Sequence, residues 1–79
     1  HNTLLKDHIV RLIPKEMASN HNLLVLKSHL NKIKIALADT QNLQALQYLK
    51  AQFKDAVITI LPTSKADIHH AIQYYYGSS

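Results

Sequence analysis

Three lysines have the residue type and spacing most suggestive of chemistry in this sequence. Lys32 and Lys34 alternate with apolar residues, and Lys27 follows the apolar run 23–26. Side chains at alternate positions of a strand project from one face, where ammonium groups attract anions. We therefore expect Lys27, Lys32 and Lys34 to contact an acidic partner. The alternative is an ordinary solvated basic surface.

The charge distribution restricts the choice of partner. The chain has 79 residues and a formal net charge of +4. Residues 1–34 hold six Lys or Arg against two Asp or Glu, and residues 35–79 hold three against three. A basic half can attract nucleic acid, anionic lipid or an acidic protein. Arg11 is the single arginine and the expected strands contain no aromatic residue, so nucleic-acid binding is the weakest of these alternatives.

No residue pattern indicates a catalytic, cofactor or metal site. The chain has no cysteine, which excludes thiolate chemistry, and one glycine, which excludes a glycine-rich phosphate loop. Of six histidines, His69 and His70 are adjacent and would point about 100° apart on a helix, while the others lie on separate segments. Ser64 is explained by helix capping rather than by catalysis. We expect no enzyme activity, no cofactor and no metal in this fragment.

Hydrophobic spacing predicts the elements that position the lysines. Hydrophobic residues make up 47% of the chain, enough for one small core. In chain order we expect a short amphipathic helix over 1–10, a helix over 15–20, an antiparallel hairpin over 23–38, a helix over 43–53, a strand over 56–61 and a helix over 65–76.

The order of these elements predicts the fold class. Residues 32–61 form a strand–helix–strand unit, whose strands should be parallel with a right-handed crossover. The fold is then α/β (α+β): a small three-stranded mixed sheet with an antiparallel hairpin and helices packed on it. No linker or repeat divides the chain, so we expect a single domain over 1–79.

Local signals refine these expectations. Asn31 is expected to take a positive φ in the hairpin turn, and Asn42 and Ser64 to cap the two following helices. The continuous β-branched and apolar run 56–61 is typical of a strand covered on both faces. On the last helix we expect Tyr75 in the buried stripe and Tyr76 at its rim, before the helix stops at glycine.

Five segments, taken in order, resemble one known family. They are Arg11–Ala18, Leu23–Leu26, Lys32–Asp39, Asn42–Leu46 and Ile68–Gly77. Together they resemble the N-terminal domain of type II secretion and type IV pilus assembly ATPases, the general secretory pathway protein E N-terminal domain family. The resemblance covers about residues 11–77. The hairpin departs from the family's glycine pair at Leu30 and Asn31.

The resemblance implies a noncatalytic, regulatory protein-interaction domain from a bacterium. It would dock the motor onto an inner-membrane platform protein, in the cytoplasm and peripheral to that membrane, with no insertion of its own. A related branch binds cyclic di-GMP through paired Arg-Leu-Gly repeats upstream of the Leu-Ile-Pro segment. This chain lacks those repeats, so we do not expect cyclic di-GMP as a partner. The alternative is a cyclic di-GMP-responsive regulatory domain of a secretion ATPase or of a membrane glycosyltransferase.

Overall fold

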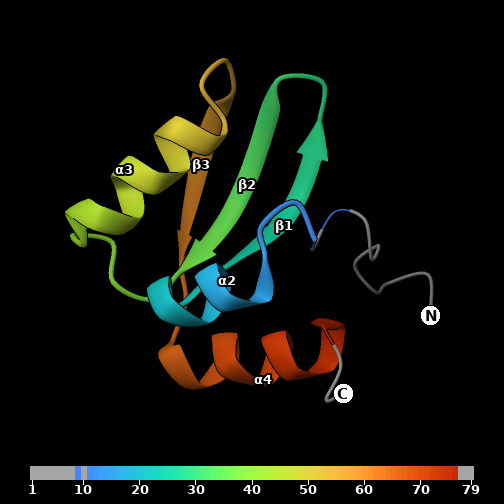
Figure 1. Cartoon of the computed structure of the whole chain (residues 1–79), viewed down its shortest axis with the longest axis vertical. Helices are drawn as coiled ribbons and strands as arrows, with labels where there is room; N and C mark the ends of the chain where they lie inside the picture. Colours follow the sequence, from blue (N-terminus) through green and yellow to red (C-terminus); the bar gives the residue numbers. More distant parts are fainter. Residues whose placement is uncertain (1–8, 10, 77–79) are drawn as a thin grey trace.

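Helices and strands alternate along most of the chain, as the hydrophobic spacing predicts (Figure 1). The computed structural model describes Ile9 and residues 11–76. Their elements are α2 (Lys15–His21), β1 (Leu23–His29), β2 (Lys32–Leu37), α3 (Leu43–Gln52), β3 (Val57–Pro62) and α4 (Lys65–Tyr76). The helix expected over 1–10 and the glycine stop after Tyr76 lie outside the described residues, apart from Ile9.

The described strands form one mixed sheet in the order β1-β2-β3. β1 and β2 pair antiparallel, and β2 and β3 pair parallel, which confirms the predicted fold class. Backbone hydrogen bonds extend the second pairing at both ends. The Val57 N–H donates to the Asn31 carbonyl at 2.6 Å, and the Thr63 N–H donates to the Leu37 carbonyl at 3.1 Å.

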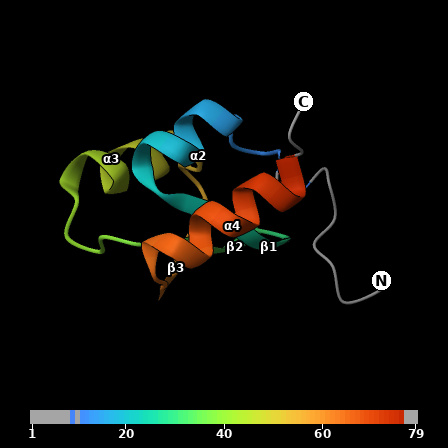
Figure 2. The same cartoon turned by 90° about the horizontal axis from the view of Figure 1, so that it is seen from below.

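The larger part of the core lies on one face of this sheet. Ile33, Ile35 and Leu37 alternate along β2 and are all buried, as the two-residue period of a half-buried strand requires. Figure 2 shows α2 and α3 on the same side of the sheet. Ala45 and Leu49 of α3 and Ala18 of α2 belong to the same core. The helices therefore cover the face that β2 makes apolar.

Helix α4 lies across the end of the sheet where β1 begins and β2 ends (Figure 1). It contacts both strands and α2. Leu24 and Ala36, paired across the hairpin on the face opposite Ile35, are each 3% exposed. The opposite face is thus covered at this end. Lys32 and Lys34 lie nearer the start of β2, away from α4, and are exposed.

Two of the predicted helix caps are present. The Asn42 side chain accepts a hydrogen bond from the Ala45 N–H at 3.2 Å, at the start of α3. The Ser64 hydroxyl accepts one from the Asp67 N–H at 3.1 Å, at the start of α4. Each cap satisfies a backbone donor that a helix leaves unpaired at its first turn.

The hairpin turn differs from the prediction. Leu30, not Asn31, has the positive φ, at 56°. The connection is tight, because His29 pairs with Lys32 and leaves two residues in the loop. In a two-residue hairpin loop the first residue takes positive φ in both favoured turn types. The position in the loop, rather than the tolerance of asparagine, sets this angle.

The prediction that β3 is covered on both faces was wrong. Val57 is 57% exposed and Leu61 is 44% exposed, whereas Ile58 and Ile60 between them are half-buried. β3 lies at an edge of the sheet of described strands, and the helices cover one of its faces there. An apolar run by itself does not distinguish an edge strand from a central one.

The last helix buries a different tyrosine from the one expected. Tyr76 is 8% exposed, Tyr75 is half-buried and Tyr74 is 64% exposed. The Tyr76 hydroxyl donates a hydrogen bond to the Ile13 carbonyl at 2.5 Å. This tertiary contact draws the Tyr76 ring onto the segment before α2, which helical spacing within α4 could not reveal.

Candidate anion-binding site on the sheet

A register shift in the hairpin brings Lys27 beside Lys34. Val25 pairs with Ile35 on the buried face, and strict alternation would place Lys27 on that face too. The register shifts between Val25 and Lys27, so that Leu26 is extra and Lys27 pairs with Lys34. One additional residue in a strand reverses the face of those that follow it. The irregularity therefore moves Lys27 to the exposed face.

Two rows of side chains result on that face. Lys27, Lys34 and Thr59 are partners across the three strands, and His29, Lys32 and Val57 are the next such row. Neighbouring strands lie about 4.8 Å apart, and alternate residues of a strand about 7 Å apart. The predicted lysines are therefore neighbours on one face.

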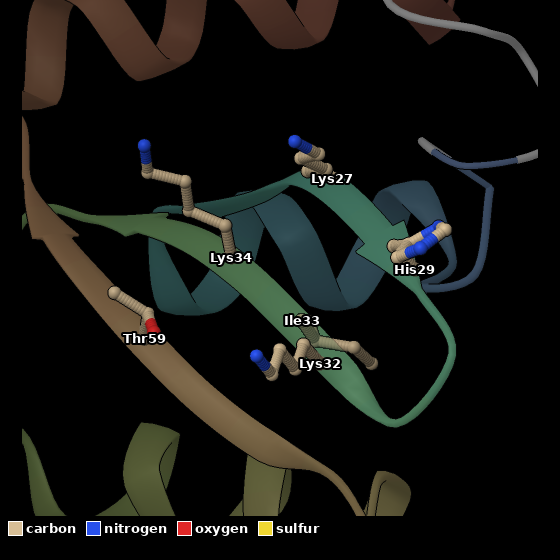
Figure 3. Close-up of a pocket in the computed structure, with 6 residues that line it drawn as sticks. All are labelled: Lys27, His29, Lys32, Ile33, Lys34 and Thr59. Atoms are coloured by element: carbon tan, nitrogen blue, oxygen red, sulfur yellow. The ribbon is translucent and has the colours of Figure 1, made fainter.

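An open pocket of ≈ 290 Å³ lies among these rows. It is lined by Lys27, His29, Lys32, Ile33, Lys34 and Thr59 (Figure 3). Figure 3 shows Lys27 and Lys34 extending in the same direction from neighbouring strands. The structure thus brings together all three lysines expected to contact a partner, and adds an imidazole and a hydroxyl to them.

The pocket concentrates positive charge without compensation from the described residues. None of its lining residues is acidic. Lys27, Lys32 and Lys34 form no ion pair with any described carboxylate. Like charges directly opposite each other on two strands are destabilising. A bound anion would remove that cost, so the arrangement is suited to anion binding.

Sequence reasoning missed His29 and Thr59 as members of the site. His29 could have been found, since a two-residue hairpin loop places it opposite Lys32. Thr59 could not have been found in this way. β2 and β3 are parallel and joined through a helix, so no tight turn fixes which of their residues are paired. The place of Thr59 beside Lys34 depends on how α3 packs.

A second cavity lies between the start of the described chain and the end of α4. It measures ≈ 510 Å³ and is lined by Arg11, Ile13, Pro14, Lys15 and Tyr76. The Arg11 guanidinium carbon lies 5.8 Å from the centroid of the Tyr76 ring, within the range of a cation–π contact. Burial raises the pKa of the Tyr76 hydroxyl, while the Arg11 charge acts to lower it and Tyr48 raises it further.

Two other described histidines, His21 and His69, make side-chain contacts on separate elements. The His21 ring stacks on Tyr48 with centroids 5.4 Å apart, and His69 Nε2 lies 2.6 Å from Asn22 Oδ1. Within the described ranges, no group of three His, Asp or Glu side chains could hold a metal ion. Among the described helices none is long and apolar enough to span a bilayer.

The structure is a small α+β domain with a basic pocket on the exposed face of its sheet. Residues 2–79 match the MshEN domain family. The chain belongs to that family, the N-terminal regulatory domains of type II secretion and type IV pilus ATPases. This confirms the family resemblance found in the sequence.

A solved structure described as "Structure of MshE with cdg" shares this fold. It superposes with a TM-score of 0.83 at 22% sequence identity, over 91% of this chain and 52% of that chain. This chain therefore spans about half the length of the MshE chain it matches. No curated protein matches the sequence.

The comparison corrects one prediction about partners. We did not expect cyclic di-GMP, because the Arg-Leu-Gly repeats are missing from these residues. MshE, however, is solved with cdg, which is cyclic di-GMP, and that overturns the expectation. The prediction rested on the absence of the repeats from these 79 residues alone. The matched MshE chain is about twice as long.

Proposed function

We propose that this chain is a noncatalytic regulatory domain that docks the motor of a type IV pilus or type II secretion ATPase onto its inner-membrane platform protein. The observation that carries the proposal is an uncovered basic pocket on a domain of the MshEN family. In this role the domain works in the cytoplasm, peripheral to the inner membrane through its partner, and needs no cofactor or metal.

The basic pocket would act in docking through charge. Lys27, Lys32 and Lys34 provide three ammonium groups on a face that α2 and α3 leave open. Complementary charge raises the rate of encounter and sets the orientation of two proteins more than it raises affinity. Docking through this face should therefore weaken as salt screens the lysines.

The test measures binding of this chain to the cytoplasmic part of the platform protein by titration calorimetry. The triple variant Lys27→Glu, Lys32→Glu, Lys34→Glu should lose binding. The matched control, Lys50→Glu, Lys54→Glu, Lys65→Glu, makes the same charge change at exposed positions outside the pocket and should keep it. Absence of binding by the unaltered chain contradicts the docking function. Equal losses in both variants contradict the role of the pocket.

A second candidate function is regulation by cyclic di-GMP, which the solved MshE structure favours. The cavity beside Tyr76 supports it in this chain. Arg11 and Lys15 offer cations suited to phosphate, and a guanidinium can also stack on a base. The nucleotide would then lie between the Leu-Ile-Pro segment and the end of α4.

Titration with cyclic di-GMP, followed by amide chemical shifts, tests this second function. Saturable shifts at Arg11, Lys15 and Tyr76 are expected, with weaker binding in Arg11→Gln and unchanged binding in Lys50→Gln. GMP at the same concentration is the ligand control. Shifts no larger than those caused by GMP would contradict nucleotide recognition by this chain.

A further inference from the structure

We propose that the pocket around Lys27, Lys32 and Lys34 binds an acidic protein segment that carries two carboxylates at alternate positions. This inference rests on the proposed docking function and names the chemistry of the partner at the same site. His29 and Thr59 complete the binding surface, and neither is among the residues expected from the sequence.

The spacing of the two rows selects the arrangement of the carboxylates. Lys27 and Lys34 lie directly opposite each other, and Lys32 is two residues from Lys34 on the same strand. Alternate residues of a strand lie about 7 Å apart, so the side chains of Lys34 and Lys32 leave the sheet about that far apart along β2. An extended acidic segment that runs along the sheet repeats its own side chains at about the same interval. One carboxylate can then lie in each row.

The walls of the pocket favour a segment with an apolar residue between its carboxylates. Lysine side chains have four-carbon stems that cover apolar surface while their charges reach outward. Thr59 adds a methyl group on the same face. A leucine side chain placed between two glutamates would contact the lysine stems and the Thr59 methyl group, while the two glutamate carboxylates reach the ammonium groups.

The pocket lacks the features of a phosphate or nucleotide site. Protein phosphate sites commonly use backbone N–H groups from a helix N-terminus or a loop nest. The lining residues here all lie on strands. None of them is an arginine, the residue suited to bidentate phosphate contacts, and none is an aromatic residue other than His29 on which a base could stack. Carboxylates of a protein are the anions that fit best.

The test uses the chain with a synthetic peptide, acetyl-Gly-Glu-Leu-Glu-Gly-amide, followed by amide chemical shifts. Saturable shifts should be confined to β1, β2 and β3 around the two rows. Binding should be about tenfold weaker in the variant Lys27→Gln, Lys34→Gln, because two exposed charge contacts are lost. The variant Lys50→Gln, Lys54→Gln has the same charge and should bind like the unaltered chain.

Two further ligands decide between anion classes. The Gln-Leu-Gln counterpart of the peptide and inorganic phosphate should both bind more weakly than the acidic peptide. Equal binding by either one overturns the proposal, as does an equal loss of affinity in the two double variants. Peptide binding without binding to the platform protein would overturn the docking function and leave the acidic-segment site standing. Platform binding that survives Lys27→Gln, Lys34→Gln would overturn the site and leave the docking function standing.

Discussion

The hydroxyl of Tyr76 donates a hydrogen bond to the carbonyl oxygen of Ile13 at 2.5 Å, which joins the end of the last described helix to the segment before α2. Ile13 is fully buried and Tyr76 is 8% exposed. The bond therefore lies in a poorly hydrated environment, where an unpaired carbonyl oxygen is costly. It ties together two parts of the chain that are far apart in sequence.

Removal of this hydroxyl should destabilise the fold. We expect Tyr76→Phe to lower the free energy of unfolding by about 1–2 kcal/mol, because the Ile13 carbonyl loses its partner while the ring remains. Urea denaturation followed by circular dichroism measures the change. Tyr74→Phe is the matched control, since Tyr74 is 64% exposed and should change stability little. Equal stability of Tyr76→Phe and the unaltered chain would contradict a structural role for the bond.

The same tyrosine should make stability depend on alkaline pH. Burial raises the pKa of Tyr76 above its ordinary value of 10.0 in the folded chain. Above about pH 10 the unfolded chain therefore loses this proton first, and the folded chain binds more protons than the unfolded one. The contribution of Tyr76 is thus complete below about pH 10 and is lost as pH rises through the raised pKa.

Denaturation curves measured from about pH 9 upward test this sign. Tyr76→Phe should lose stability less steeply with rising pH than the unaltered chain does. Part of the slope should persist in the variant, because burial also raises the pKa of Tyr48. A parallel decline in both proteins would show that Tyr76 titrates alike in the folded and unfolded chains.

The opposed lysines predict that loss of one charge stabilises the domain. Lys27 and Lys34 are direct partners across the hairpin. Lys34→Gln should raise the free energy of unfolding by about 0.5 kcal/mol at low salt, since a like-charge pair is removed. The gain should vanish in about 1 M NaCl, where the screening length is about 3 Å. Lys50→Gln on α3 serves as the control, and an equal gain there would assign the effect to net charge alone.

The hairpin turn predicts a second stabilising substitution. Leu30 has φ 56° and is 89% exposed, so its side chain gains little from packing while its backbone is in the left-handed region. Leu30→Gly should raise the free energy of unfolding by about 0.5–1 kcal/mol. Glycine removes the steric cost of the left-handed conformation, and the larger conformational entropy that glycine loses on folding offsets part of that gain. Thermal and urea denaturation measure it.

Leu30→Ala separates the backbone from the side chain in that experiment. Alanine keeps the Cβ atom and hence the unfavourable φ, but removes the exposed apolar group. It should leave stability close to that of the unaltered chain. A gain in alanine as large as in glycine would show that the exposed leucine side chain, and not the backbone angle, sets the cost.

The period of the hydrophobic residues and the capping side chains were enough to determine most of the element order. Asn42 and Ser64 begin α3 and α4 as predicted, because a cap is a contact within one turn of chain. The alternation of Ile33 and Ile35 with Lys32 and Lys34 likewise determined which side of β2 is exposed. These features depend on neighbours in sequence, which is why they can be read from it.

Tertiary structure alone decided which residues meet at the pocket. The extra residue at Leu26 reverses the face of Lys27, and nothing in the run 23–28 marks it. Thr59 reaches Lys34 through a parallel pairing whose register depends on the packing of α3, and Tyr76 is buried by a contact with Ile13. The sequence thus supplied the lysines and the elements that carry them. Register and packing placed them together, because those depend on contacts between segments that the chain brings together only when it folds.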